Sequence, residues 1–535
     1  MAKPILTVEN LTVALPEVAD RQYAVADISF TLEAGEILCI VGESGSGKSV
    51  TANAVMGLLP PILKIESGKI RLHDREIQSL SAKERESLNG RIVSMIFQDP
   101  LSALNPLMTI GQQIEEVMLT HAEAAPQNRW ERVVELLGMV GLPDPSTLAH
   151  QYPFRLSGGQ RQRVMIAMAL ALDPDLLIAD EPTTALDVTT QAQILTIIRD
   201  LQRQKRMAVM FITHDFGVVS DIADKVIVME KGKLIEQGTA ESVLTAPKEP
   251  YTRRLLAAIP TMRTEARRPI REDAPIVLDI RNLKKSYKTG GGLFGKARVV
   301  PAVNDISFQL RKGETLGIVG ESGSGKSTLG RMVMKLLDID SGSILFDGED
   351  VVPMPEATFR KKRPYIQMIF QDPFASLNPR HTIEHSLICG PMTFGVSLEA
   401  ARTNARRLMK RVGMPEQTLE RYPHEFSGGQ RQRIGIARAL MFNPLLLIAD
   451  EAVSALDVSI QAQVLQLLDE IQQETKISMM FITHDLRVAS QICDRIAVLQ
   501  RGRLVELAPS YELFSAPKDP YTQSLVEAIP GWSTS

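Results

Sequence analysis

The pattern of hydrophobic and polar residues predicts short buried strands that end in polar loops. Residues 37–41, 176–179 and 209–212 are uninterrupted apolar runs, as expected for parallel strands that are covered on both faces. Residues 48–59 follow the first run after a glycine-rich loop and have the apolar spacing of a helix. Residues 27–32 alternate between polar and apolar, which is typical of a half-exposed antiparallel strand. The pattern therefore predicts an α/β fold.

An internal repeat divides the chain into two halves. The sequence Gly-Glu-Ser-Gly-Ser-Gly-Lys-Ser starts at Gly42 and returns at Gly320. The sequence Ser-Gly-Gly-Gln starts at Ser157 and returns at Ser427. The stretch between the halves is polar and contains prolines, as linkers do. We expect a first α/β domain, a linker and a second α/β domain, over 1–262, 263–275 and 276–535.

Composition narrows the class of protein. The 535 residues are 44% hydrophobic and 23% charged, which is ordinary for a globular protein and excludes extended disorder or collagen-like repeats. The formal net charge of −3 provides no global basic field that would attract nucleic acid. Cys39, Cys389 and Cys493 lie far apart in sequence and form no metal-binding pair, so we expect each to be a small buried hydrophobe.

No stretch of the sequence predicts a membrane span. The longest apolar run, 164–172, has nine residues, whereas a spanning helix needs about 20. The first residues lack the apolar segment of a secretory signal. We therefore expect a cytosolic protein that works at a membrane only through other subunits.

The two glycine-rich loops have the spacing of a phosphate-binding P-loop, because each follows a buried strand and precedes a helix. Main-chain N–H groups of such a loop converge on an anion, and the helix N-terminus adds partial positive charge. The lysine is expected to reach the β- and γ-phosphates of a nucleotide, and the serine after it to hold Mg²⁺. The nucleotide-binding residues expected in these loops are Gly42, Glu43, Ser44, Gly45, Ser46, Gly47, Lys48 and Ser49, and Gly320, Glu321, Ser322, Gly323, Ser324, Gly325, Lys326 and Ser327.

A pair of carboxylates follows another buried strand in each half. Asp180 and Asp450 come directly after four apolar residues, so they lie at the carboxyl end of a parallel strand. Such a side chain suits the shell of a Mg²⁺ ion. The next residues, Glu181 and Glu451, are candidates to polarise an attacking water.

Together these motifs resemble those of the ATP-binding cassette (ABC) ATPases. The runs Leu-Ser-Gly-Gly-Gln and Phe-Ser-Gly-Gly-Gln are similar to the signature sequence of that family, and both halves follow its motif order. The resemblance implies two P-loop cassettes, each a RecA-like α/β core with an antiparallel β subdomain and a helical lobe. It also implies ATP and Mg²⁺ as cofactors, with each ATP between the P-loop of one half and the signature of the other. The signature residues that would bind ATP are Ser157, Gly158, Gly159, Gln160, Ser427, Gly428, Gly429 and Gln430.

The resemblance also assigns catalytic and sensing roles. His214 and His484 would contact the γ-phosphate and support Glu181 and Glu451 in catalysis. Glutamines ahead of each helical lobe would sense Mg²⁺ or the nucleophilic water and move the lobe when ATP binds. The side chains implied around Mg²⁺ are Ser49, Gln98, Asp180, Ser327, Gln371 and Asp450.

The aromatic side chain that stacks on adenine differs between the halves. Tyr287 stands where the family places this aromatic and would bind ATP. The equivalent position in the first half is Leu15, and Tyr23 is a nearby substitute.

Two further features are similar to the peptide/nickel branch of ABC importers. Each glutamine, Gln98 and Gln371, starts a run that ends in Leu-Asn-Pro, as in that branch. Pro-Tyr-Thr at 250–252 and 520–522 resembles the branch's C-terminal His-Pro-Tyr segment, although an acidic residue replaces the histidine. The resemblance implies an ATP-hydrolysing subunit that energises the import of peptides or peptide-like solutes.

The implied partners are two membrane permease subunits and an extracytoplasmic solute-binding protein. The chain would then be peripheral, on the cytoplasmic face of the bacterial inner membrane, with membrane contact only through partners and no nucleic-acid partner. An importer of nickel, opines or glycosides is the alternative for the cargo. A soluble tandem cassette acting on ribosomes or DNA is disfavoured by the short linker and the scattered cysteines, and an exporter ATPase by the Leu-Asn-Pro runs.

Overall fold

The computed structural model describes residues 3–17, 19–121, 126–184, 186–263, 265–268, 273–289, 298–372, 376–454 and 456–531. Residues 269–272 of the expected linker and residues 373–375 of the second run that ends in Leu-Asn-Pro lie outside the described residues. The chain forms two compact units. The first comprises Met1–Leu186, Thr190–Ile259 and Pro530–Ser535, and the second Asp187–Thr189 and Pro260–Ile529.

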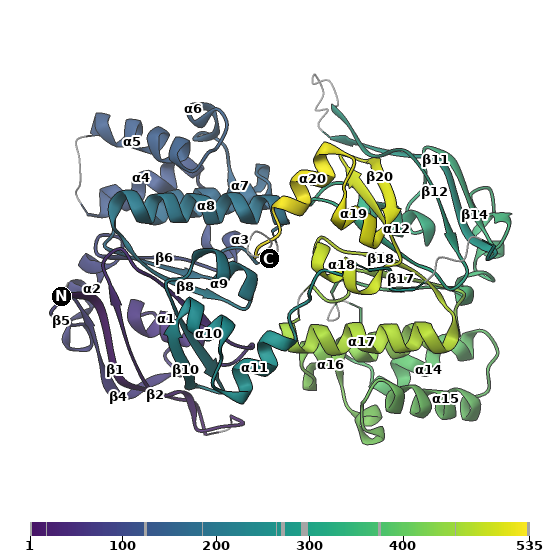
Figure 1. Cartoon of the computed structure of the whole chain (residues 1–535), viewed down its shortest axis with the longest axis horizontal. Helices are drawn as coiled ribbons and strands as arrows, with labels where there is room; N and C mark the ends of the chain where they lie inside the picture. Colours follow the sequence, from purple (N-terminus) through teal and green to yellow (C-terminus); the bar gives the residue numbers. More distant parts are fainter. Residues whose placement is uncertain are drawn as a thin grey trace. The chain divides into compact units, whose positions relative to one another are not determined.

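The described part of the first unit contains two sheets (Figure 1). The core sheet has the order β10-β9-β3-β8-β7-β6, with only the β9–β10 pair antiparallel. Its strands are β3 (Ile37–Val41), β6 (Val93–Ile96), β7 (Leu176–Asp180), β8 (Ala208–Thr213), β9 (Lys225–Glu230) and β10 (Lys233–Thr239). The antiparallel sheet, in the order β2-β1-β4-β5, contains β1 (Pro4–Ala14), β2 (Tyr23–Glu33), β4 (Lys64–Leu72) and β5 (Arg75–Glu76).

The helices of this half surround the core sheet and form a separate lobe. The lobe helices α4 (Ile110–Thr120), α5 (Pro126–Met139) and α6 (Pro145–Leu148) gather at the end of the unit away from β1, β2 and β4 (Figure 1). The remaining helices are α1 (Lys48–Met56), α2 (Ala82–Leu88), α3 (Pro100–Ala103), α7 (Gly158–Ala169), α8 (Val188–Lys205), α9 (Phe216–Ile222), α10 (Ala240–Thr245) and α11 (Pro250–Ala257). The fold predicted from the sequence, an α/β core with an antiparallel subdomain and a helical lobe, is confirmed.

The hydrophobic pattern located the strands that carry the site. All five side chains of β3 and of β7 are buried, as predicted for parallel strands covered on both faces. Burial in β2 alternates from Ile28 onward, as predicted for 27–32. The helix predicted over 48–59 ends earlier, at Met56, because Gly57 takes a left-handed conformation with φ of 68° and stops it.

The second unit repeats this architecture. Its described core sheet has the order β16-β17-β18-β13-β19-β20, and its antiparallel sheet the order β12-β11-β14-β15. The strands are β11 (Ile276–Thr289), β12 (Arg298–Arg311), β13 (Thr315–Val319), β14 (Ser341–Phe346), β15 (Glu349–Asp350), β16 (Ile366–Ile369), β17 (Leu446–Asp450), β18 (Ser478–Ile482), β19 (Arg495–Gln500) and β20 (Arg503–Pro509). The helices are α12 (Lys326–Val333), α13 (Glu356–Phe359), α14 (Ile383–Thr393), α15 (Leu398–Arg411), α16 (Gly428–Leu440), α17 (Val458–Thr475), α18 (Leu486–Ile492), α19 (Ser510–Ser515) and α20 (Pro520–Glu527).

The three cysteines differ in exposure. Cys39 and Cys493 are buried, as expected, but the expectation for Cys389 was wrong, because it faces outward from α14 and is exposed.

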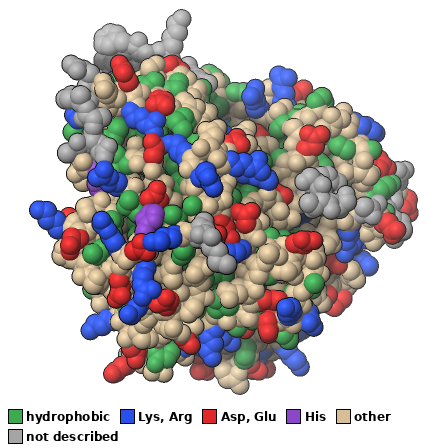
Figure 2. Space-filling view, turned by 60° about the vertical axis from the view of Figure 1, so that its left-hand side comes forward, with side chains coloured by type: hydrophobic (Ala, Val, Ile, Leu, Met, Phe, Trp, Pro, Cys, Tyr) green, Lys and Arg blue, Asp and Glu red, His purple; other side chains and the backbone are tan. Residues whose placement is uncertain are grey.

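On the face shown in Figure 2, Lys and Arg side chains are interspersed with Asp and Glu. Within the described part of the chain, no helix combines the length and apolar character that crossing a bilayer requires.

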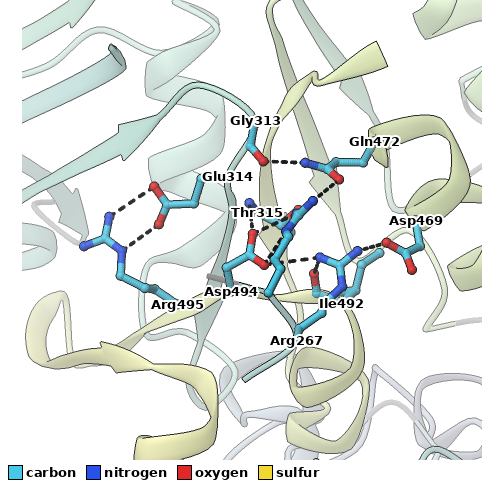
Figure 3. Close-up of polar contacts among 10 residues, drawn as sticks. Arg267, Gly313, Glu314, Thr315, Asp469, Gln472, Ile492, Asp494 and Arg495 are labelled. Atoms are coloured by element: carbon cyan, nitrogen blue, oxygen red, sulfur yellow. Dashed lines mark hydrogen bonds and ion pairs between the residues drawn. The ribbon is translucent and has the colours of Figure 1, made fainter. Parts of the chain in front are cut away.

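Two arginines of the expected linker segment belong to the second unit (Figure 3). Arg268 donates from Nε and Nη2 to the two carboxylate oxygens of Asp494, at 2.7 and 2.8 Å. Asp494 also accepts from the main-chain N–H of Thr315, the first residue of β13, at 2.8 Å. Arg267 pairs with Asp469, and its side chain is only 5% exposed. These contacts tie the segment to the base of the strand that leads into the second P-loop.

Candidate functional site

The P-loop of the first unit folds around its own lysine. Lys48 is buried, and its Nζ donates to the carbonyl oxygens of Gly42 and Glu43 at 2.7 and 2.9 Å. Gly47 precedes α1 with φ of 104°, and a Cβ there would lie 2.6 Å from the carbonyl oxygen of Ala24. Only glycine fits this position, because it combines a left-handed backbone with a close main-chain contact.

The second unit builds the same loop. Lys326 Nζ donates to the carbonyl oxygens of Gly320 and Glu321 at 2.7 and 2.8 Å. Burial lowers the pKa of Lys326. The buried hydroxyls of Ser46 and Ser324 have no hydrogen-bond partner among the described residues, so both loops retain an unsatisfied donor. Such donors fit a phosphate oxygen.

A serine–aspartate pair lies beside each P-loop. Ser49 Oγ donates to Asp180 Oδ1 at 3.0 Å, and Ser327 Oγ donates to Asp450 Oδ1 at 2.9 Å. Burial raises the pKa of both aspartates, and the serine hydrogen bonds oppose this. A hydroxyl and a carboxylate, placed together at the start of a helix, form the oxygen donor set that Mg²⁺ prefers. The residues predicted for the metal therefore fit it chemically.

The glutamate after each aspartate is held by a histidine and a glutamine. In the first unit, His214 Nδ1 lies 3.5 Å from Glu181 Oε1, and Gln98 Nε2 donates to Glu181 Oε2 at 3.0 Å. In the second unit the same distances to Glu451 are 3.4 Å from His484 and 2.6 Å from Gln371. The structure thus brings together three side chains that the sequence placed on separate strands and loops.

The glutamates also have unusual backbone geometry. Glu181 and Glu451 have φ of 46° and 48°, in the left-handed region of backbone conformation that residues other than glycine rarely adopt. Their N–H groups donate to Ile212 and Ile482 carbonyl oxygens at 3.0 and 2.9 Å, which anchors the strained residue to the neighbouring strand. Strain of this kind, about 1–3 kcal/mol per residue, collects at functional sites.

Electrostatics favour an ion pair between each histidine and glutamate. Burial opposes ionisation of Glu181, but the hydrogen bond and charge of His214 outweigh it and lower the pKa of Glu181. Burial likewise opposes the imidazolium, yet the hydrogen bond and charge of Glu181 raise the pKa of His214. The pKa of Glu451 is lowered and that of His484 raised for the same reasons. The carboxylates are therefore ionised near neutral pH and can accept a proton.

The two glutamates differ in one contact that the sequence analysis missed. Thr184 Oγ1 donates to Glu181 Oε2 at 3.0 Å, so this oxygen accepts from two side chains. The corresponding Ser454 Oγ instead donates to the main-chain oxygen of Glu451 at 3.1 Å. The Thr-to-Ser difference between the repeats was the available signal, but it did not reveal which oxygen the hydroxyl would reach.

Each signature run starts a helix. Ser157 and Gln160 form a reciprocal cap at the start of α7, with hydrogen bonds of 3.0 and 3.2 Å, and Ser427 and Gln430 repeat it on α16. A Cβ at Gly159 would lie 2.6 Å from Thr190, so a glycine is needed for close packing. The N–H groups of a first helical turn lack intrahelical acceptors, which suits them to an anion.

The predicted adenine-stacking residues lie on the antiparallel sheets. Tyr287 is on β11, paired with Val300 of β12, and its side chain is exposed. Val300 is two residues from Ala302, whose carbonyl oxygen faces Gly325 at the start of α12. Tyr23 directly precedes the corresponding Ala24 in the first unit. Both tyrosines thus lie close in the sheet to a residue that contacts a P-loop glycine, and their stacking role stays a prediction.

Two families match the sequence. The family described as ABC transporter matches residues 25–184 and 303–454. The family described as oligopeptide/dipeptide transporter, C-terminal region, matches residues 235–290 and 505–533.

Individual relatives are similar over nearly the full length. The glutathione import ATP-binding protein GsiA of Escherichia coli (strain K12) is 45% identical over 98% of this chain and 89% of the relative. The protein of the same name from Shigella boydii serotype 4 (strain Sb227) gives the same values. Among solved structures, the dimeric cassette MJ0796 with ADP and Pi is 27% identical, covering 44% of this chain and 98% of that chain, with a TM-score of 0.40. The chain cbiO1 from Clostridium perfringens is 28% identical, covering 45% and 91%, with a TM-score of 0.41.

Proposed function

We propose that this chain, which belongs to the ABC transporter family and to its oligopeptide/dipeptide branch, hydrolyses ATP at two sites and energises the import of peptides or peptide-like solutes. The observation that carries the proposal is the duplicated cluster of P-loop lysine, serine–aspartate pair and histidine-held glutamate. Its parts combine phosphate binding with a proton acceptor, which is what hydrolysis of a nucleotide requires.

The roles of the residues follow from their chemistry. Lys48 and Lys326 hold the β- and γ-phosphates, and the P-loop N–H groups surround the same anion. Mg²⁺, when bound, neutralises phosphate charge, and the serine–aspartate pairs are the side chains that would hold it. Glu181 and Glu451 accept a proton from the attacking water, while the histidine and glutamine beside each keep its carboxylate in place. The sharing of each ATP between the two halves stays a prediction.

Replacing each glutamate by glutamine tests the hydrolytic roles. Glu181→Gln and Glu451→Gln keep the shape and lose the proton acceptor, so each should reduce ATP turnover strongly and still bind ATP. Turnover of the purified chain with Mg²⁺ and ATP, together with equilibrium ATP binding, measures both effects. Wild-type turnover in one variant would show that its site does not hydrolyse ATP.

The proposed partners are two membrane permease subunits and an extracytoplasmic solute-binding protein, with the chain peripheral at the cytoplasmic face of the inner membrane.

The helical lobes, about 99–156 and 372–426, would contact the permeases, because each lies between a glutamine that touches the catalytic carboxylate and a signature helix. Leu101 and Leu107 of the first lobe are 60% and 85% exposed, as a docking surface requires. Cysteines at these positions should crosslink to a permease loop, whereas crosslinks confined to the tails around Tyr251 and Tyr521 would contradict this assignment.

Uptake measurements identify the cargo. The relatives named above are glutathione import proteins, so labelled glutathione and di- to hexapeptides are the first candidates. Cells lacking the gene should lose uptake, and a gene with Lys48→Ala and Lys326→Ala should not restore it. Loss of nickel or glycoside uptake with unchanged peptide uptake would replace the cargo and leave the importer role intact. Greater retention of a compound after deletion would reverse the direction of transport.

A further inference from the structure

The C-terminal tail of the second half touches the P-loop of its own unit. In the second unit, the phenol oxygen of Tyr521 accepts from the main-chain N–H of Glu321 at 3.2 Å. Glu321 is the second residue of the P-loop, and its carbonyl oxygen accepts from Lys326 Nζ at 2.8 Å. Glu321 therefore makes two contacts: its N–H donates to the tail tyrosine, and its carbonyl oxygen accepts from the phosphate-binding lysine.

The tail is fixed firmly enough to act as a support. Glu506 of β20 is buried and accepts from the N–H groups of Lys518 and Asp519 at 3.0 and 3.1 Å, which ties the turn before α20 to the core sheet. Asp519 then caps α20 by accepting from the N–H of Tyr521 at 2.8 Å. Thr522, in the first turn of α20, is buried. The tyrosine is thus anchored on both sides before it reaches the loop.

The first unit repeats the anchoring of the tail. Glu236 is buried and accepts from the N–H groups of Lys248 and Glu249 at 2.8 and 3.2 Å. Tyr251 is buried, and burial together with the charge of Glu43, the second residue of the first P-loop, raises its pKa. The carbonyl oxygen of Glu43 accepts from Lys48 at 2.9 Å. The Tyr251 hydroxyl has no hydrogen-bond partner among the described residues, so the first unit repeats the anchored tail but not the hydrogen bond to the loop.

We propose that Tyr521 is a positioning residue of the ATP site at the second P-loop, whose phenol fixes Glu321 and so holds Lys326 in its phosphate-binding position. The proposal rests on the proposed ATPase function and deepens it, since it gives the second Pro-Tyr-Thr tail a role in nucleotide binding. Without the phenol, the loop populates its binding arrangement for a smaller fraction of the time, and the apparent affinity for ATP falls by that fraction.

The test removes the phenol oxygen of Tyr521 and keeps the ring. The full chain with Tyr521→Phe should show a rise of roughly 3- to 10-fold in KM and Kd for ATP at the second P-loop, as expected from losing one hydrogen bond at that site. Its kcat at saturating ATP and its melting temperature should stay near those of the wild type. The matched control is Tyr511→Phe, because Tyr511 lies in the same tail region and donates to Glu512 at 2.9 Å, not to the P-loop.

Alanine variants separate positioning from packing. Tyr521→Ala removes the ring as well, so a packing role predicts that phenylalanine at this position restores wild-type KM, whereas our proposal predicts that it does not. Unchanged KM in the phenylalanine variant, or an equal rise in the Tyr511→Phe control, would overturn the proposal. If the wild-type chain itself neither bound nor hydrolysed ATP, the proposed function would fail instead.

Discussion

Replacing Asp494 by asparagine should destabilise the second unit through the two linker arginines. The side chain of Asp494 is only 4% exposed and pairs with Arg268 in a bidentate contact, while the Arg267 guanidinium lies 3.5 Å away. Burial lowers the pKa of Arg267 to about 10, so this guanidinium still carries its charge at neutral pH. The substitution removes the negative charge and replaces one carboxylate oxygen by an NH2 donor, so asparagine can still accept from the Thr315 N–H but loses one of the two hydrogen bonds from Arg268.

The magnitude follows from what the arginines retain. Leaving a fully buried charge without its partner costs about 3–5 kcal/mol, but Arg267 keeps Asp469 and the Arg268 side chain is 25% exposed, so we expect about 2–3 kcal/mol. For a unit of this size, that loss lowers the melting temperature by about 4–12 °C. Asp494→Asn with Arg268→Met, which rebalances the charge, should recover part of the loss.

The assay is calorimetric unfolding of the full chain, with hydrogen exchange at the Thr315 amide as a local readout. The matched control is Asp224→Asn in the first unit, because Asp224 accepts from the Ile37 N–H at 2.8 Å and has no arginine partner among the described residues. This control should cost much less. If Asp494→Asn lowered the melting temperature no more than Asp224→Asn, the arginines would contribute nothing measurable and the argument would be refuted.

Two further predictions concern the ATP sites. Because the pKa of His484 is raised and that of Glu451 lowered, their ion pair contributes its full stability only between the usual values of about 4.3 for glutamate and about 6.5 for histidine. This contribution is lost as pH rises through the raised pKa of His484, and also as pH falls through the lowered pKa of Glu451. The difference in melting temperature between wild type and His484→Gln should therefore be larger at pH 6 than at pH 9, and a constant difference would count against it. Gly325→Ala would place a Cβ 2.1 Å from a carbonyl oxygen at φ of 102°, so it should cost at least about 1–3 kcal/mol and impair ATP binding, whereas Gly323→Ala, with open space around its Cβ, should bear the backbone strain alone.

The sequence predicts the backbone path of the P-loops, where the pattern is local, and misses contacts between residues that are far apart in sequence. The P-loops were predictable because the spacing of Gly42, Gly47 and Lys48 imposes one backbone path. The tail tyrosines were noticed as a repeated motif, but the contact of Tyr521 with Glu321 joins residues 200 positions apart, which no local pattern encodes. For residues this far apart in the sequence, neither the local pattern nor the composition indicates which ones will be in contact.

The linker shows the same limit in another form. A polar stretch with prolines and no apolar period predicts a solvated connection, and residues 263–275 fit that description. Arg268 is nevertheless tied to Asp494, 226 residues later, and Arg267 is nearly buried. A charged residue is normally exposed, because burying a charge costs free energy unless an oppositely charged partner is buried with it. Here the partners are Asp469 and Asp494, which lie about 200 residues later in the sequence.

The arginine contacts bear on how such a fused protein can be divided. A second half encoded on its own from Ile276 would lack both guanidinium groups, and Asp469 and Asp494 would stay behind as carboxylates without these counter-charges. A separately encoded version would therefore have to carry the stretch around Arg267 as an N-terminal extension of its own. The segment that joins the two ATPase halves is therefore part of the folded second unit and does more than connect the two.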